Sequence, residues 1–395
     1  MAGVSGGRVV TSAASLRPVA GTPDDIERLL GAFLAANEPA PLVVETSGSS
    51  GQAKQVALSA RALRASATAT LARLGGAGQW VLTLPAHYVA GLQVLTRSLL
   101  SGTTAVRLGD HDDLASAVNA MASGRRYLAA VPTQLHRWLA HADSVAALAS
   151  LDAVLLGGGA ASPELLTRAQ DRGVRVVTTY GMSETSGGCV YDGVALDGVA
   201  VALGSGGEVR LAGPVLFDGY AGRPDLTAAV LRDGWLRTPD LGRFDAGGRL
   251  VVVGRADDVV VSGGVNVALP AVEACLQTMP GIGAVAVAAR PDPEWGASVV
   301  AVVAGAGSAD GPFSGVPAGA AVSTAVPSLA AVRDFVADEH PRSWAPRELV
   351  VVDALPMLDS GKVDRQRLAA LLDSSDWATR EVSATGRTNP EKAQT

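Results

Sequence analysis

The hydrophobic pattern of the first half of the chain alternates between two kinds of segment. Short apolar runs, as in LVVE at 42–45, WVLTLP at 80–85 and LDAVLLGGGA from 151, are typical of buried strands. Longer stretches with helical spacing, such as 60–74 and 163–172, lie between them. Strands that alternate with helices in this way predict an α/β domain built on a mostly parallel sheet.

The pattern changes near residue 199. Short strands separated by Gly and Asp-Gly turns follow as far as the charged segment 254–258, which is typical of an antiparallel or barrel-like β subdomain. Strand and helix signals then restart. We therefore expect a large N-terminal domain over 1–256, in which the parallel sheet is joined by the barrel-like subdomain, and a small α+β C-terminal domain over 257–375, connected to it by a hinge.

Two segments predict no regular structure. Residues 305–327 are rich in Gly, Ala, Ser and Pro and predict a flexible loop within the small domain. Residues 376–395 are polar and aperiodic, and they predict a disordered tail.

Composition and charge narrow the class of protein. The chain has 395 residues of which 48% are hydrophobic, so it can bury a sizeable core, and its net charge of −6 argues against nucleic acid as a partner. Its two cysteines, Cys189 and Cys275, cannot build a disulfide framework or a zinc site on their own, and we expect two reduced thiols. Neither a signal-peptide pattern nor an apolar run long enough to span a membrane is visible, so a cytoplasmic protein is expected.

Lysine is scarce. Only three of the 32 basic residues are lysines, at positions 54, 362 and 392, and the others are arginines. Because this chain supplies nearly all of its positive charge with arginine, a lysine in a polar loop is a candidate for a specific task.

The first such loop, TSGSSGQAK at 46–54, follows the strand at 42–45. Glycines let backbone N–H groups turn towards an anion, hydroxyls add donors, and Lys54 adds a mobile point charge, a combination that suits a polyphosphate. The loop is not a Walker A motif, because only two residues separate Gly48 from Gly51. An ordinary Gly/Ser turn is the alternative.

Three further segments carry candidate chemistry. In TTYGMSET at 178–185, Tyr180 could lie against a nucleotide base and Glu184 could bind Mg²⁺. In DGWLRTPD, Asp240 could accept hydrogen bonds from a ribose diol. The polar loop DSGKVD at 359–364 carries Lys362. Taken singly, each could instead be a turn or a salt-bridging residue.

Taken in order, these segments resemble the adenylate-forming superfamily of acyl-CoA synthetases, adenylation domains and luciferases over roughly residues 40–372. The loop at 46–54 looks like its phosphate loop, 178–185 its adenine and magnesium segment, GRADDVVVSGGVNV its hinge, and LPMLDSGKVDR its catalytic-lysine loop. Within the superfamily, the compact chain, the segment AVPTQLHRWL and the GGGAAS loop look most like the o-succinylbenzoate–CoA ligases of menaquinone biosynthesis, in their short actinobacterial form.

The resemblance implies a reaction in two halves that uses ATP, Mg²⁺ and CoA. A substrate carboxylate attacks the α-phosphate of ATP to give an acyl-adenylate and pyrophosphate, and the thiol of CoA then displaces AMP. It implies Lys362 and Glu184 as catalytic residues, with Glu184 on the metal, and Asp257 as the hinge about which the small domain rotates. The ATP-binding residues that it implies are Thr46, Ser47, Gly48, Ser49, Ser50, Gly51, Lys54, Gly158, Gly159, Ala160, Thr179, Tyr180, Gly181, Met182, Ser183, Asp240 and Arg255.

The acyl and CoA sites rest on fewer residues. Gly263 and Gly264 are expected near the path of CoA. The candidates for the acid are His87, Gln134 and Ser186, each weighed against a packing role. The acid itself stays open, because another aryl-CoA or acyl-CoA ligase would carry the same motifs.

Some features depart from the family pattern. Only 45 residues precede the phosphate loop, fewer than is usual, so the acyl pocket could be more open or could be covered in a homodimer. Pro239, Ala271 and Met357 stand where the family more often has Gly, Glu and Arg, but none of these changes removes a catalytic group. An acyl-AMP ligase that loads a carrier protein, and a nucleotide-binding module without catalysis, are the alternative functions.

Overall fold

The structure is a computed structural model that divides into two compact units, one ending at Ala256 and the other beginning at Asp257. The residues that the structure describes are 17–46, 54–122, 124–282, 284–304, 327–357 and 363–373.

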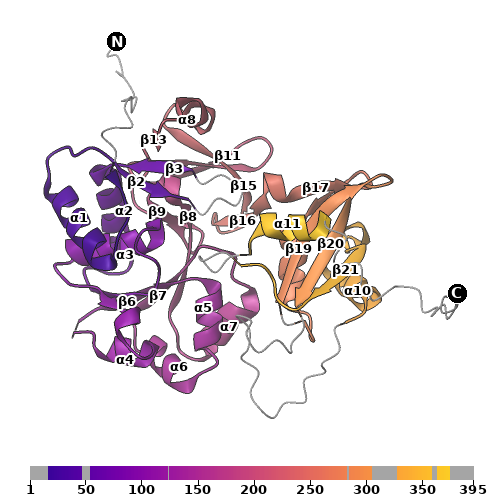
Figure 1. The fold of residues 1–395 in the computed structure, drawn as a ribbon, viewed down its shortest axis with the longest axis horizontal. Helices are drawn as coiled ribbons and strands as arrows, with labels where there is room; N and C mark the ends of the chain where they lie inside the picture. The colour runs from indigo at the N-terminus through magenta and orange to yellow at the C-terminus, as the bar shows by residue number, and fades with distance from the viewer. Residues whose placement is uncertain are drawn as a thin grey trace, which may run out of the picture. The chain divides into compact units, whose positions relative to one another are not determined.

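A seven-stranded sheet forms the centre of the larger unit, in the order β10-β9-β8-β7-β6-β4-β5 (Figure 1). The five strands from β8 to β5 run parallel, and β9 and β10 are antiparallel, so the prediction of a mostly parallel sheet is confirmed. The strands are β4 (Gln79–Leu82), β5 (Val106–Arg107), β6 (Arg126–Ala130), β7 (Ala153–Leu156), β8 (Val176–Met182), β9 (Gly187–Tyr191) and β10 (Val194–Ala195).

Helices cover both faces of this sheet. Neighbouring strand residues point to opposite faces, so Trp80 packs into one hydrophobic cluster and Val81 into the other. Ser59 caps α2 by accepting a hydrogen bond from the backbone N–H of Ala62, which confirms the predicted helix start. The helices are α1 (Pro23–Ala35), α2 (Ala60–Arg73), α3 (Val89–Leu100), η2 (Leu108–Asp110), α4 (Leu114–Asn119), α5 (Pro132–Trp138), α6 (Ala142–Ala149), α7 (Pro163–Asp171) and η3 (Ser183–Thr185).

A second sheet of four strands holds the two ends of the predicted phosphate loop. Its order is β1 (Arg17–Pro18), β2 (Leu42–Glu45), β3 (Gln55–Leu58) and β13 (Gly219–Tyr220). The antiparallel pair β3–β13 places Tyr220 opposite Val56. This register brings a segment that is distant in the sequence to the end of the loop that contains Lys54.

The β subdomain is an antiparallel sheet built around the long strand β15 (Trp235–Phe244). β12 pairs with one edge of β15, while β14 and then β16 pair with the other. The β12–β15 register shifts in the region that contains Pro239, which has no N–H to give to a ladder. The remaining elements here are β11 (Ala200–Leu203), β12 (Glu208–Ala212), α8 (Pro224–Val230), β14 (Leu231–Arg232) and β16 (Leu250–Arg255).

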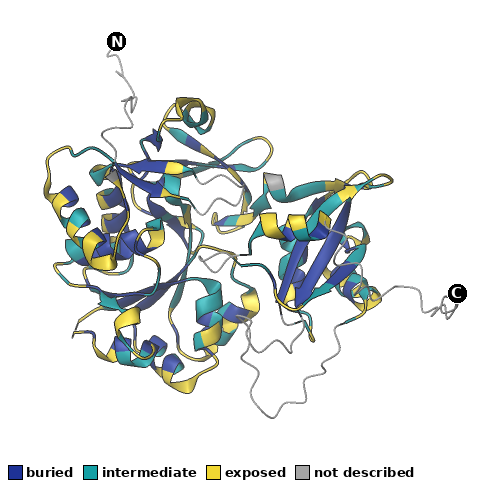
Figure 2. Ribbon diagram, in the orientation of Figure 1, coloured by how far each residue is buried: buried dark blue, intermediate teal, exposed yellow. Residues whose placement is uncertain are grey.

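The smaller unit packs helices on both faces of a three-stranded sheet, β19-β20-β21, whose strands hold much of its buried core (Figure 2). Both predicted helices are present: the one at 270–278 begins and ends one residue earlier, and the one at 328–339 begins one residue later. The predicted loop at 305–327, except for its last residue, and the predicted tail at 376–395 lie outside the described residues. The elements are η4 (Ala256–Asp258), β17 (Val259–Ser262), β18 (Val265–Ala268), α9 (Leu269–Gln277), β19 (Ala284–Asp292), β20 (Gly296–Ala304), α10 (Leu329–Glu339), η5 (Arg342–Trp344), β21 (Glu348–Val352) and α11 (Arg365–Asp373).

Among the described residues of both units, no helix has the length and apolar character needed to cross a membrane.

Candidate active site

The two ends of the predicted phosphate loop are tied together. The backbone N–H of Thr46 donates to the carbonyl of Lys54 (2.9 Å), and the backbone N–H of Lys54 donates to Oγ1 of Thr46 (3.0 Å). These bonds continue the β2–β3 ladder, so the two ends of the loop lie side by side. Its inner residues, including the candidates Ser47, Gly48, Ser49, Ser50 and Gly51, lie outside the described residues.

Tyr220 contacts both the Lys54 end of this loop and the predicted metal ligand. Nζ of Lys54 lies 5.2 Å from the centroid of the Tyr220 ring, within range of a cation–π interaction. The Tyr220 hydroxyl donates to Oε1 of Glu184 (2.7 Å). Burial, and then the Glu184 charge, raise the pKa of Tyr220, so its hydroxyl stays a donor. One aromatic ring therefore holds together the cation proposed for phosphate and the carboxylate proposed for Mg²⁺.

Tyr220 was not among the residues predicted from the sequence. Its position becomes apparent only from the pairing of β13 with β3 and from the bond between the Phe217 N–H and the Glu184 carbonyl (2.9 Å), which draws this segment along η3. A Gly-Tyr pair carries no local signal in the sequence of such a partner.

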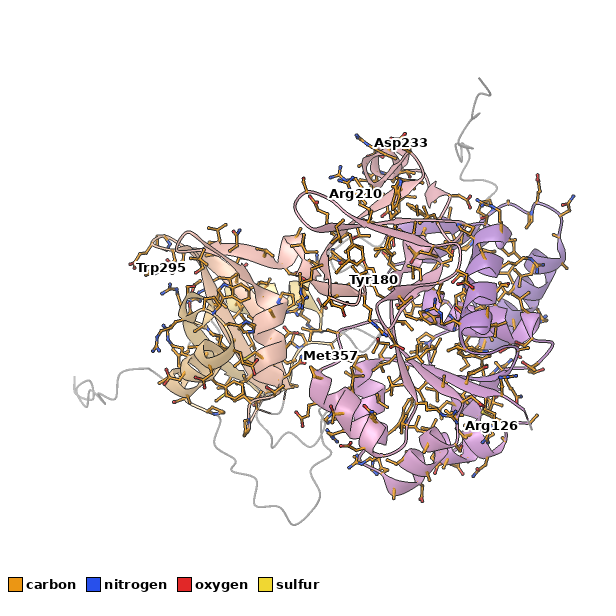
Figure 3. All side chains as sticks on the ribbon, turned by 180° about the vertical axis from the view of Figure 1, so that it is seen from behind. Arg126, Tyr180, Arg210, Asp233, Trp295 and Met357 are labelled. Carbon is orange, nitrogen blue, oxygen red and sulfur yellow. The ribbon has the colours of Figure 1, made fainter. Side chains whose placement is uncertain are left out.

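The residues proposed for adenine and ribose also meet. The Tyr180 hydroxyl, at the end of β8, donates to Oδ2 of Asp240 on β15 (2.7 Å; Tyr180 is labelled in Figure 3). Arg255, directly opposite Asp240 in the β15–β16 ladder, places Nη1 3.9 Å from Oδ1. Burial, followed by the Asp240 charge, raises the pKa of Tyr180. Because Tyr180 and Glu184 belong to one short segment, this cluster neighbours the one around Tyr220.

Two glycines let the backbone pass closely through this region. A Cβ on Gly157 would overlap the Thr179 hydroxyl, and a Cβ on Gly181 would overlap the carbonyl of Gly187. The loop after β7 therefore touches β8 at Gly157. The next three residues in the chain, Gly158, Gly159 and Ala160, are exposed. Further along β8, the Met182 N–H donates to the Thr185 hydroxyl (2.9 Å), and the carbonyl of Ser183 accepts from the Ser186 N–H (3.0 Å).

Two of the three candidates for the acid have their polar groups engaged with the backbone. Oε1 of Gln134 accepts from the Val131 N–H (3.1 Å), and its Nε2 donates to the Thr83 carbonyl (2.9 Å). Ser186 is fully buried at φ +53°, and its hydroxyl donates to the Val215 carbonyl (2.8 Å). These contacts favour a positioning role for both.

His87 differs from those two candidates. It is exposed, and its ring lies 4.3 Å from that of Tyr88. An exposed imidazole can bind a carboxylate, and the acyl-site role of His87 stays a prediction.

In the smaller unit, Gly263 and Gly264 form the tight turn between β17 and β18, with φ of +60° and +77°. The Gly263 N–H donates to the carbonyl of Trp295 (2.9 Å; Trp295 is labelled in Figure 3), and the Arg347 guanidinium lies 3.6 Å from the centroid of that indole ring. The turn is therefore held against the β19–β20 hairpin.

Lys362 lies outside the described residues, but the ends of its loop are described. Met357 and Val363 form an isolated antiparallel bridge, and the Asp364 N–H donates to the Pro356 carbonyl (2.8 Å). For Asp257 only the backbone is described, at the division between the two units.

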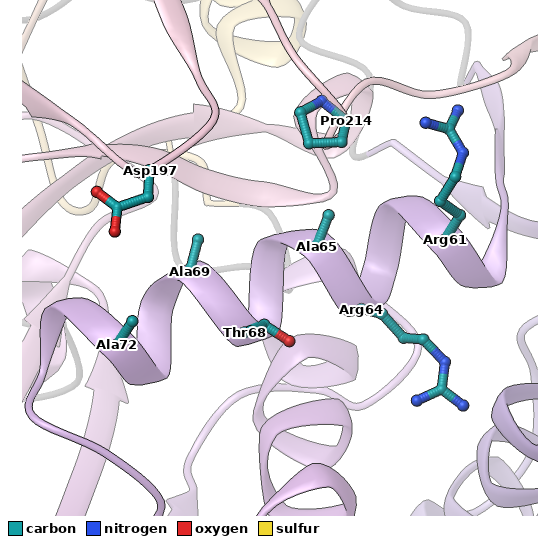
Figure 4. A pocket seen from close by; sticks show the side chains of 8 residues that line it. All are labelled: Arg61, Arg64, Ala65, Thr68, Ala69, Ala72, Asp197 and Pro214. Atoms are coloured by element: carbon teal, nitrogen blue, oxygen red, sulfur yellow. The ribbon is translucent and has the colours of Figure 1, made fainter.

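An open groove of about 670 Å³ lies elsewhere, along one face of α2 (Figure 4). Small side chains and two arginines line it, and none of the predicted site residues does. We therefore do not assign the reaction to this groove. Its lining residues are Arg61, Arg64, Ala65, Thr68, Ala69, Ala72, Asp197 and Pro214.

The sequence matches the AMP-binding enzyme family over residues 35–209 and the AMP-binding enzyme C-terminal domain over residues 271–362. A relative from Mycobacterium tuberculosis (strain H37Rv), named probable 2-succinylbenzoate–CoA ligase, is 42% identical over 357 residues, which cover 88% of this chain and 89% of the relative. The chain belongs to the AMP-binding enzyme family. The resemblance inferred from the ordered motifs is thereby confirmed.

Other members of the AMP-binding enzyme family are longer. The 2-succinylbenzoate–CoA ligase of Enterococcus faecalis is 28% identical over 352 residues, which cover 82% of this chain and 68% of that protein. Among solved structures, o-succinylbenzoate CoA synthetase (MenE) from Bacillus subtilis, in complex with the acyl-adenylate intermediate OSB-AMP, aligns with a TM-score of 0.69 at 25% identity, over 83% of this chain and 68% of that one. The amide bond synthetase McbA from Marinactinospora thermotolerans aligns equally well, at 26% identity over 84% and 69% of the two chains. The predicted fold is confirmed by these alignments.

Proposed function

We propose that this AMP-binding enzyme is an acid–CoA ligase that converts o-succinylbenzoate, ATP and CoA into o-succinylbenzoyl-CoA, AMP and pyrophosphate, a step of menaquinone biosynthesis. The observation that carries the substrate is the 42% identity to the mycobacterial relative named for this reaction, over nearly all of both chains. The convergence of Lys54, Tyr220 and Glu184 supports the nucleotide chemistry.

The donor set around Tyr220 fits a magnesium–polyphosphate. Carboxylate and hydroxyl oxygens are the ligands that Mg²⁺ takes, and Glu184 and Thr46 supply one of each. Bound Mg²⁺ supplies neutralisation of phosphate charge. Lys54 contributes a positive charge towards the β- and γ-phosphates. Tyr220 holds one oxygen of the Glu184 carboxylate by a hydrogen bond, which restricts the orientation of the whole carboxylate.

The nucleoside end is proposed to lie at the other cluster. Asp240 accepts from the ribose hydroxyls while Tyr180 holds its Oδ2 and Arg255 lies near its Oδ1. The loop 158–160 and the Tyr180 ring flank adenine. Placing the base, ribose and phosphates separately orients the α-phosphorus for attack, which is the main contribution that a protein makes to such a transfer.

Bond making and breaking then proceed in two steps. A carboxylate oxygen of the acid bonds to the α-phosphorus, and the bond to the leaving pyrophosphate breaks, with Lys362 offsetting the charge of the carboxylate and the α-phosphate. The thiol of CoA loses its proton, its sulfur bonds to the acyl carbon, and AMP leaves with the oxygen that the acid supplied. Rotation about Asp257 removes Lys362 and brings Gly263 and Gly264 to the path of CoA.

A panel of carboxylic acids tests this proposal. Each acid is incubated with ATP, Mg²⁺ and CoA, and pyrophosphate and thioester are measured in parallel. We expect o-succinylbenzoate to give both products in equal amounts and faster than benzoate or succinate. Pyrophosphate without thioester would indicate an acyl-AMP ligase that loads a carrier protein, and neither product with any acid would indicate a binding module.

Two further parts of the proposal concern the cell and the assembly. We place the reaction in the cytoplasm, where ATP and CoA are supplied. A homodimer that covers the acyl pocket would appear as twice the chain mass in light scattering, and a single chain mass would refute it.

A further inference from the structure

Three potential metal ligands meet in the smaller unit, and none of them is among the predicted site residues. Cys275 lies near the end of α9, Glu339 is the last residue of α10, and His340 follows it as the C-cap. One ligand atom from each side chain, namely sulfur, carboxylate oxygen and ring nitrogen, lies within 4.8 Å of the other two. In the part of the chain that the structure describes, no other set of three such ligands lies so close together.

Neighbouring groups hold these ligands in place. Cys275 is 4% exposed and lies in the core between α9 and the sheet, while Glu339 and His340 reach the cluster from the surface. The His340 ring stacks on Trp344, with ring centroids 5.2 Å apart and planes 18° apart. This stacking fixes the plane of the His340 ring without using either of its nitrogen atoms.

The chemistry of the three groups suits a cation. Glu339 brings a carboxylate oxygen close to the Cys275 sulfur and to a ring nitrogen of His340. A thiol that coordinates a divalent cation gives up its proton.

We propose that Cys275, Glu339 and His340 bind one Zn²⁺ ion, with water as the fourth ligand. Sulfur and imidazole nitrogen select a borderline-soft ion over Mg²⁺ or Ca²⁺, and a mixed Cys/His/carboxylate set is one that Zn²⁺ accepts in tetrahedral geometry. On binding, the Cys275 proton passes to solvent and a Zn–S bond forms, with no change of oxidation state. The ion would clamp the end of α9 to the end of α10. The small number of cysteines gave no sign of this site, because two of the three ligands come from a distant segment.

Cobalt substitution tests the proposal on the full chain after chelator treatment and dialysis. Co²⁺ is added as the spectroscopic probe, and zinc affinity is measured by competition with a chromophoric chelator. We expect one equivalent of Co²⁺ to give a thiolate-to-cobalt charge-transfer band that is absent in Cys275→Ser. Cys189→Ala serves as the matched control, because that thiol is also buried but lies in the larger unit, and it should keep the band.

His340→Phe keeps an aromatic ring for stacking on Trp344 but removes the nitrogen ligand, so it should weaken zinc binding at least about tenfold. Zinc should also raise the unfolding temperature of the wild-type chain but not that of the Cys275→Ser/His340→Phe chain. Unchanged zinc affinity in either variant, or a wild-type chain that gives no charge-transfer band, would overturn the proposal. None of these readouts depends on ligase activity.

Discussion

The Tyr220 hydroxyl is the contact whose removal tests the active-site geometry most selectively. Tyr220→Phe deletes the 2.7 Å hydrogen bond to Glu184 but keeps the ring that lies beneath Lys54. If that bond fixes Glu184 for the metal, the variant should bind Mg²⁺·ATP poorly and should adenylate slowly, while its fold is retained.

The expected magnitude follows from the chemistry of the bond. A hydrogen bond to a charged group contributes about 1.5–3 kcal/mol, and about 1.4 kcal/mol corresponds to a tenfold change. Tyr220 is 7% exposed, so water replaces the lost hydroxyl only in part. We therefore expect kcat/KM for pyrophosphate release to fall about tenfold or more, together with a higher Mg²⁺ requirement.

The assay is pyrophosphate release at varied Mg²⁺ and fixed acid. Tyr127→Phe is the control, because it removes a phenol of the same unit that donates to the Leu74 and Gly76 carbonyls instead of to Glu184. That variant should lose stability but keep its Mg²⁺ dependence. If Tyr220→Phe matches the wild-type chain in both kcat/KM and Mg²⁺ dependence, the role given to the bond is refuted.

Three other predictions concern the lysine loop and the fold. Lys362→Ala should abolish pyrophosphate release but spare thioester formation from supplied acyl-adenylate, with Lys392→Ala as control; equal loss in both half-reactions would contradict the division of labour. Gly157→Ala should lower the free energy of unfolding, measured by thermal unfolding, by about 1–3 kcal/mol, because the added Cβ overlaps the Thr179 hydroxyl. Adding Thr179→Ala should recover most of that loss, and no recovery would disprove the clash. Burial, and then the charge of Arg168, lower the pKa of His136 in the folded chain below its ordinary 6.5. As the pH drops below 6.5, the unfolded chain takes up a proton at this imidazole before the folded chain does, so the free energy of unfolding should fall. His136→Gln should flatten that fall, and parallel curves for the two proteins would argue against it.

The sequence predicted those parts of the fold that local patterns specify. The apolar run at β7 and the helical spacing of α7 are local, so their alternation was enough to indicate a parallel sheet. The start of α2 was visible because Ser59 is a good N-cap. Helix α1 was overlooked although Thr22 and Asp25 form a capping box before it, a signal that the sequence does contain.

The site was predictable as far as its motifs are contiguous. Tyr180 and Asp240 were identified separately, and the structure adds the hydrogen bond between them. Tyr220 could not be found in this way, because its place depends on the register of β13 with β3. Likewise nothing near Gln134 in the sequence reveals that its amide reaches the Thr83 carbonyl. Site contacts that depend on the register between distant strands cannot be predicted from a single sequence.

The central claim, that this protein activates a carboxylate as an acyl-adenylate before transfer to CoA, is tested most directly by following an oxygen atom. o-Succinylbenzoate labelled with ¹⁸O in its carboxylates is converted with ATP and CoA, and the AMP is examined by mass spectrometry. Because the carboxylate oxygen stays on phosphorus when the thiol displaces AMP, one ¹⁸O should appear in each AMP formed. AMP without the label, formed alongside the thioester, would contradict the mechanism.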